Sequence, residues 1–119
     1  MQKCAFKTIA INRYGFASQC LECGKIHLGF GTFVLAFQPE NIGPFLKAYT
    51  LAYQHYRNNT EGRLVKEIVI PTPSRQISML FNLEEMEAFL DFMKEIQNAM
   101  FIKKLADHAV SGKGCAAFN

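Results

Sequence analysis

No apolar run in this chain approaches the roughly 18 residues that a membrane-spanning helix requires. The N-terminal stretch, Met1 to Lys7, has no apolar core of the kind found in secretory signal peptides. We therefore expect a cytoplasmic protein that has no association with membranes. In that compartment cysteines are kept as reduced thiols or metal ligands rather than disulfides.

Short catalytic motifs are also lacking. The sequence contains no nucleophile elbow, no phosphate-binding glycine loop and no paired-acid motif. Three neighbouring glutamates, Glu84, Glu85 and Glu87, fall where a helix is predicted to begin, and the helix dipole explains them there. We therefore expect that the protein is not an enzyme.

The composition is that of a folded domain. Half of the 119 residues are hydrophobic and 13% are aromatic, which is enough for a core and argues against disorder. Residues up to Lys66 carry 8 basic and 3 acidic side chains, whereas the remainder carry 5 basic and 7 acidic ones. This basic surplus in the first half is compatible with an anionic partner, although an ordinary solvated surface explains it as well.

Hydrophobic periodicity predicts an α+β fold, with an antiparallel sheet of about five strands and two helices on one face. A turn at Asn12–Gly15 joins the first two strands, and Asn82 caps the second helix. We expect a single domain over residues 1–119, with a flexible tail over 111–119. The predicted strands cover residues 4–11, 16–20, 26–37, 64–70 and 76–81, and the predicted helices cover about 38–57 and 82–108.

The two halves of the chain, about 1–60 and 61–110, share a pattern. When the sequence is shifted by 44 residues, Phe33–Ile42 aligns without a gap on Ile77–Met86, and Phe37 falls on Phe81. Any passage from an amphipathic strand to an amphipathic helix gives a similar pattern, but the number of matches favours a duplicated strand–helix unit.

The candidate site is Cys20-x-x-Cys23, which is followed by a glycine. Two thiolates at this spacing suit a tight turn that directs both sulfurs to one tetrahedral metal ion. The predicted hairpin brings Cys4 beside them, and either His27 or Cys115 is available as a fourth ligand. We therefore predict a structural zinc site, while reduced core or surface thiols are the simpler alternative.

Two other functions use the same region. A redox role for the cysteine pair is less favoured, because reactive pairs usually lie at a helix N-terminus and this one lies between two strands. Binding of single-stranded nucleic acid is an alternative to protein interaction, because Tyr14 and Phe30 accompany several cations. Those cations are Arg13, Lys25, Arg57, Arg63 and Lys66.

A homodimer is also predicted. Read as one strand, residues 26–37 are apolar on both alternating faces, and Phe92 falls outside the buried stripe of its helix. Two helices do not easily cover both faces of a sheet, so a second copy of the chain would supply the missing cover.

The order of Cys20-x-x-Cys23, the run Leu28-Gly-Phe-Gly-Thr32 and an apolar strand entering a helix resembles a small uncharacterised family of short Bacteroidetes proteins. The quoted match covers residues 20–37. The resemblance implies a one-domain cytosolic protein and implies no substrate.

Overall fold

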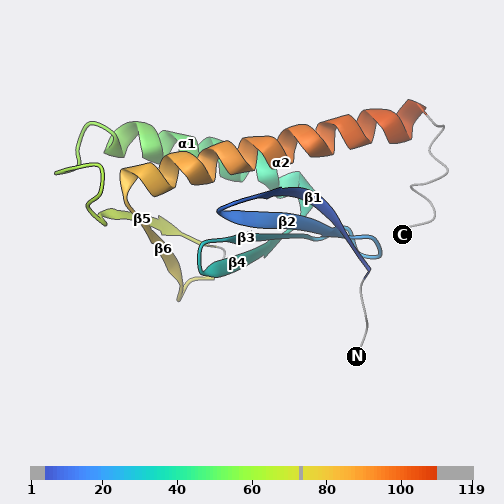
Figure 1. Cartoon of the computed structure of the whole chain (residues 1–119), viewed down its shortest axis with the longest axis horizontal. Helices are drawn as coiled ribbons and strands as arrows, with labels where there is room; N and C mark the ends of the chain where they lie inside the picture. The colour runs from blue at the N-terminus through green and yellow to red at the C-terminus, as the bar shows by residue number, and fades with distance from the viewer. Residues whose placement is uncertain (1–4, 73, 110–119) are drawn as a thin grey trace. The chain divides into compact units, whose positions relative to one another are not determined.

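A computed structural model describes residues 5–72 and 74–109, and their side chains up to Ile102. The described chain contains both helices and antiparallel strands, so the predicted α+β class is confirmed (Figure 1). Within these residues, no helix combines the length and the hydrophobicity needed to cross a membrane. The elements are β1 (Phe6–Asn12), β2 (Gly15–Cys20), β3 (Ile26–Phe30), β4 (Phe33–Phe37), the 3-10 helix η1 (Pro39–Asn41), α1 (Ile42–Tyr56), β5 (Ile68–Pro71), β6 (Ser78–Phe81) and α2 (Leu83–Ala109).

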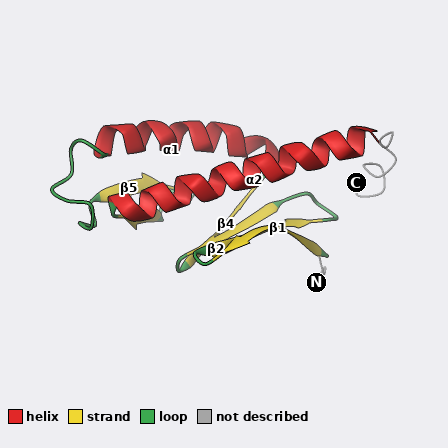
Figure 2. Cartoon of the chain, turned by 45° about the horizontal axis from the view of Figure 1, so that its top comes forward, coloured by secondary structure: helices red, strands yellow, loops and turns green. Residues whose placement is uncertain are grey.

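The chain divides into two compact units. One contains β1 to β4 and the part of α2 from Lys94 onward, and the other consists of Gly43–Met93. In the first unit the second part of α2 runs along the sheet (Figure 2). Its residues Ala99 and Met100 line a small hollow with Lys7 of β1. That the whole chain is a single domain stays a prediction, and its predicted tail over 111–119 lies outside the described residues.

The first hairpin forms where the sequence predicts it. Asn12 lies opposite Gly15, and the Asn12 Oδ1 accepts hydrogen bonds from the backbone amides of Tyr14 (2.8 Å) and Gly15 (3.0 Å). Such a local side-chain bond is the reason that asparagine favours turns. The turn sets the register of β1 against β2 as far as Ala10; the register shifts between Ala10 and Thr8, and beyond this irregularity Phe6 lies opposite Cys20.

The predicted single strand over residues 26–37 is wrong, because the structure has two strands there. β3 and β4 form a hairpin with Gly31 at its turn, in the left-handed region (φ 61°). Glycine adopts this conformation without the steric cost that a Cβ atom brings. The turn is hidden in the sequence, because the apolar residues on each side of it alternate as they would in one strand.

This hairpin changes which side chains share a face. Ile26 lies opposite Phe37, and Phe30 lies opposite Phe33. One continuous strand would turn Ile26, Leu28 and Phe30 to one face and Phe33, Leu35 and Phe37 to the other. In the hairpin all six lie on the same face of the sheet. Val34 lies on the other face and is 58% exposed.

The argument for a homodimer loses both of its premises. Residues 26–37 form two strands whose large apolar side chains, apart from Val34, lie on one face, whereas the prediction required apolar side chains on both faces. Phe92 is buried, with 1% of its surface exposed, so it is not part of an uncovered stripe.

The predicted sheet of about five strands is also not found. In the described residues β1 to β4 form a four-stranded sheet in sequence order, and β5 and β6 pair only with each other. The extra strand comes from the hairpin at Gly31. That both helices cover one face of a sheet stays a prediction.

The unit Gly43–Met93 is built around Phe89 of α2. Its ring lies 5.7 Å from that of Tyr49 on α1 and 5.3 Å from that of Phe81 on β6, between ring centroids. All three side chains are buried. Aromatic contacts therefore hold α1, β6 and the start of α2 together.

The second helix begins as predicted. Asn82 Oδ1 accepts a hydrogen bond from the backbone amide of Glu85 (2.7 Å), and the Glu85 carboxylate accepts one from the amide of Asn82 (2.9 Å). This reciprocal pair is a capping box, which satisfies two amide donors that a helix start leaves free.

The predicted duplication is matched only locally. Phe37 and Phe81 are both buried, and each is the last residue of its strand. One residue, Asn82, separates Phe81 from α2, whereas Gln38 and the 3-10 helix η1 lie between Phe37 and α1. The duplication itself stays a prediction.

Candidate functional site

The Cys20-x-x-Cys23 segment forms a tight turn at the end of β2. The amide of Gly24 donates to the carbonyl of Cys20 (2.9 Å), and the amide of Cys20 donates to the carbonyl of Lys25 (2.9 Å). Gly24 takes a left-handed conformation, with φ 78°. A side-chain amide of Gln19 also donates to the Gly24 carbonyl (3.0 Å), so the turn is bonded on two sides.

One sulfur receives a hydrogen bond from the turn itself. The backbone amide of Cys23 donates to the Sγ of Cys20 at 3.4 Å. Cys20 is 1% exposed and Cys23 is exposed, so one sulfur faces the interior and the other the surface.

The chain next to Cys4 is bonded to the turn formed by residues 20–24, the cysteine knuckle. The carbonyl of Ala5, the residue that follows Cys4, accepts a hydrogen bond from the amide of Leu21 (2.7 Å). Cys4 itself and Cys115 lie outside the described residues. Their predicted role as metal ligands therefore stays a prediction, and this contact supports it for Cys4 alone.

His27 is not grouped with the cysteine pair. Its ring lies edge-on to that of Phe6, with 5.0 Å between centroids. Within the part of the chain that the structure describes, no three histidine, cysteine, aspartate or glutamate side chains are clustered as metal ligands. His27 would have to leave Phe6 to join Cys20 and Cys23.

The proposed basic patch is divided by the fold. Arg13 and Lys25 belong to the unit of the four-stranded sheet, whereas Arg57, Arg63 and Lys66 belong to the unit Gly43–Met93. Two of the latter are engaged by acidic side chains of α2, which lies in the acidic second half of the sequence. Arg63 contacts Glu87 at 2.5 Å, and Lys66 contacts Glu85 at 2.6 Å.

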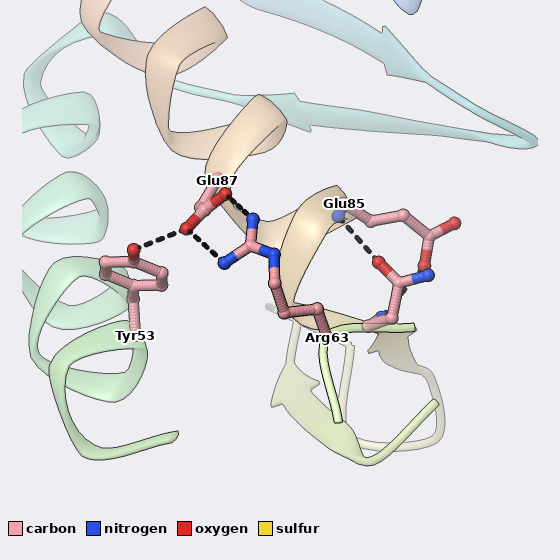
Figure 3. Close-up of polar contacts among 5 residues, drawn as sticks. Tyr53, Arg63, Glu85 and Glu87 are labelled. Carbon is pink, nitrogen blue, oxygen red and sulfur yellow. Dashed lines mark hydrogen bonds and ion pairs between the residues drawn. The ribbon is translucent and has the colours of Figure 1, made fainter. Parts of the chain in front are cut away.

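Glu87 is the centre of a cluster that the sequence did not predict (Figure 3). Its carboxylate accepts two hydrogen bonds from the guanidinium of Arg63 and one from the hydroxyl of Tyr53 (2.7 Å). The bonds from Arg63 and Tyr53 hold the pKa of Glu87 below its ordinary value. The bond to Glu87 in turn raises the pKa of Tyr53. The cluster fixes the loop after α1 to α2.

Glu85 is held in a similar way. Partial burial opposes ionisation of its carboxyl group, but the hydrogen bonds from Lys66 and from the amide of Asn82 outweigh burial, so the pKa of Glu85 is lowered. Glu85 and Glu87 therefore have a role beyond their favourable interaction with the helix dipole. They are the acidic partners of two cations from the loop.

These shifts predict how stability depends on pH. A carboxyl group whose pKa is lower in the folded state stabilises the fold above its ordinary pKa of 4.5, and that contribution is lost as the pH falls through the lower, folded value. We expect Glu87→Gln to lower the melting temperature slightly at pH 7 and to have little effect near pH 3. The pairs are largely exposed, so the effect is small.

Thermal unfolding followed by circular dichroism between pH 3 and pH 7 measures this difference. Glu95→Gln is the matched control, because Glu95 is exposed on the same helix and makes no ion pair with a described side chain. An effect of Glu87→Gln that stays constant across this range would contradict the prediction.

The described residues thus define an α+β protein with a cysteine knuckle at one end of an antiparallel sheet. The chain matches DUF6686, a family of unknown function, over residues 1–112, and it belongs to that family. No curated protein and no solved structure matches it. The resemblance to an uncharacterised family is confirmed at this level, whereas the Bacteroidetes origin and the shared motif stay predictions.

Proposed function

We propose that this protein is a small non-enzymatic binding module of the cytosol, in which Cys20 and Cys23 ligate a structural zinc ion. The observation that carries the proposal is the hydrogen bond from the Cys23 amide to the Cys20 sulfur, across a turn closed by Gly24 in its left-handed conformation. A tetrahedral metal ion requires both sulfurs on one side of the turn, so the exposed Cys23 side chain would rotate toward Cys20 when the ion binds. A reducing cytosol keeps both thiols available as ligands.

Two more ligands complete a structural site. Cys4 is the third ligand of the proposal, because Ala5 is bonded to Leu21 inside the knuckle. Cys115 is favoured over His27 as the fourth, because the His27 ring packs on Phe6. The four thiolates would leave no open coordination position, which is the mark of a structural rather than a catalytic zinc ion.

The proposal places no catalytic site at the carboxyl groups whose pKa values are shifted. Perturbed carboxyl groups often mark active sites when burial and a cleft cause the shift. Here the lowered pKa values of Glu85 and Glu87 arise from ion pairs and hydrogen bonds with Lys66, Arg63 and Tyr53. These contacts join the loop after α1 to α2, so they support a structural role for both carboxyl groups.

Protein interaction is assigned to the two-stranded ribbon of β5 and β6. Val69 and Leu80 lie opposite each other across this ribbon and are 54% and 51% exposed. Exposed apolar pairs on a ribbon with two unpaired edges favour contact with a partner chain. A homodimer is not part of the proposal, because Phe92 is buried and the large apolar residues of β3 and β4 other than Val34 lie on the core face.

The zinc site predicts one zinc ion per chain in protein purified without chelators. Chelation, Cys20→Ser and Cys23→Ser should each release the metal and lower the melting temperature by about 4 °C or more, which corresponds to about 1 kcal/mol. Elemental analysis gives the metal content, and circular dichroism gives the melting temperature.

Matched variants identify the other ligands and the alternatives. Cys4→Ser and Cys115→Ser should lower zinc affinity, and His27→Ala should leave it unchanged. Metal-free protein whose melting temperature does not respond to chelators would refute the site. A Cys20–Cys23 disulfide that oxidised glutathione forms and dithiothreitol breaks, in protein without metal, would favour the thiol-redox alternative instead.

A further inference from the structure

The four-stranded sheet has a second face, opposite the one that carries its core. Strand alternation turns Ala17, Ile26 and Leu28 to the core side, where all three are fully buried. The pairing of β1 to β4 then sets one row of residues across all four strands on the other side. That row is Ile11, Phe16, Gly29 and Val34, of which Ile11, Phe16 and Val34 are 74%, 40% and 58% exposed.

An aromatic hollow of about 240 Å³ lies at the turn end of this sheet. The ring of Phe16 covers Gly29, where any Cβ atom would overlap it. The ring of Tyr14 stacks on that of Phe30, with centroids 5.8 Å apart and planes 23° apart. Tyr14 and Phe16 are each 40% exposed, so both offer part of a ring to a ligand. Phe33, Val34 and the backbone of Gly31 and Thr32 line the rest.

A second aromatic pair lies farther along the same face. Phe6 is 48% exposed and contacts the ring of His27, two residues along β3 from Gly29. At the rise of a β-strand this is a step of about 7 Å. The face therefore carries two ring positions in succession, one at Phe16 and one at Phe6 and His27.

A cation lies near each ring position. The guanidinium of Arg13 is 4.9 Å from the centroid of the Tyr14 ring and donates to its hydroxyl (2.8 Å). Lys25 lies at the opposite end, bonded through its carbonyl to Cys20, and alternation from His27 places it on the same face. The residues Arg13, Tyr14 and Lys25, named from the sequence as part of a scattered patch, thus fall in one unit.

We propose that this face and the hollow at its turn end bind single-stranded nucleic acid, with one base in the hollow between Phe16 and Tyr14, the next at Phe6 and His27, and phosphates near Arg13 and Lys25. Antiparallel sheets with exposed aromatic side chains bind unpaired bases in this way, and stacking tolerates any base sequence. The alternation of rings and cations favours a strand of bases and phosphates over a purely apolar protein surface. This inference is independent of the zinc site and of the ribbon β5–β6.

Binding of fluorescein-labelled dT10 and rU10 to the full-length chain tests the proposal by fluorescence anisotropy. Phe16→Leu keeps an apolar side chain over Gly29 and removes the ring, so it should weaken binding roughly 5- to 150-fold, the range expected for one stacked base. Phe6→Leu should do the same at the second position. Phe101→Leu is the matched control and should change nothing, because Phe101 is an exposed ring on α2.

Salt dependence supplies an independent readout. Contacts with one or two phosphates give a slope of log K against log salt between about −0.7 and −1.4, and Arg13→Gln should make it shallower by about 0.7. Circular dichroism confirms that each variant is folded.

Several results would overturn the proposal. They are no binding of either oligonucleotide at millimolar protein, binding unchanged in Phe16→Leu and Phe6→Leu, and a slope steeper than about −3, which would require many more cations. Binding of AMP as tight as that of dT10 would indicate a pocket for a free nucleotide. Self-association in light scattering that Phe16→Leu abolishes would assign the face to a second copy of the chain.

Discussion

Phe89→Ala is expected to lower the free energy of unfolding by about 3–5 kcal/mol, the usual cost of truncating a buried phenylalanine. The ring of Phe89 has no exposed surface, and it lies against Tyr49 of α1 and Phe81 of β6. Its removal therefore leaves a cavity at the point where three elements meet. Urea denaturation followed by circular dichroism measures the change.

Phe101→Ala is the control for this experiment. Phe101 lies on the same helix but is 61% exposed, so its truncation should change the free energy of unfolding by less than about 0.5 kcal/mol. Equal effects of the two substitutions would contradict the assignment of Phe89 to the core. Phe89→Leu, which keeps most of the volume, should recover part of the loss.

Gly15→Ala is expected to be the most damaging change in the four-stranded sheet. A Cβ atom at Gly15 would overlap the backbone carbonyl of Gly29 on the neighbouring strand, and backbone cannot move aside as a side chain can. The β2–β3 pairing would have to open locally. Overpacking costs about 1–3 kcal/mol, and the rigid obstacle puts this case at the upper end.

Gly62→Ala is the matched control, because a Cβ atom there would lie 3.5 Å from Val65 Cγ2, an ordinary contact. It should leave stability unchanged or raise it by about 0.4–1 kcal/mol through the unfolded chain. Amide exchange of β2 and β3 distinguishes the two variants. Unchanged protection of β2 in Gly15→Ala would show that the sheet absorbs the methyl group.

Local signals in the sequence predicted local structure well. The Asn12–Gly15 turn and the Asn82 cap both depend on side-chain bonds within three residues, and both are confirmed. Helix α1 begins later than expected, because Pro39 and its neighbours form a 3-10 turn first. A proline can begin either kind of helix, so the sequence alone does not distinguish them.

Features that depend on distant residues were missed. The hidden turn at Gly31 folds residues 33–37 back beside β3, so Ile26, Leu28 and Phe30 share a face with the large apolar residues of β4 other than Val34 instead of lying opposite them. The pairing of Arg63 with Glu87 joins residues 24 apart in the sequence. A count of charged residues gives their total and does not show which cation pairs with which carboxylate.

The candidate site was predicted in part. Cys20 and Cys23 are in one turn, as their spacing indicates. His27 is on the neighbouring strand, but its contact with Phe6 is a packing preference that spacing does not encode. Cys4 and Cys115 lie outside the described residues, so their predicted roles remain predictions. The aromatic row on the second face of the sheet became visible only with the strand register.

The position of β4 at the end of the four-stranded sheet has a consequence for solubility. Among the residues that the structure describes, β4 pairs only with β3, and its sequence, Phe33-Val-Leu-Ala-Phe37, contains no charge and no proline. Uncharged strands of high β-propensity at a sheet edge are templates on which further chains can add, up to amyloid-like stacks. Pro39, two residues beyond the strand, cannot donate an amide hydrogen bond and so limits how far such stacking could extend. In concentrated solutions or at elevated temperature, the five residues of β4 are therefore where aggregation of this protein would begin.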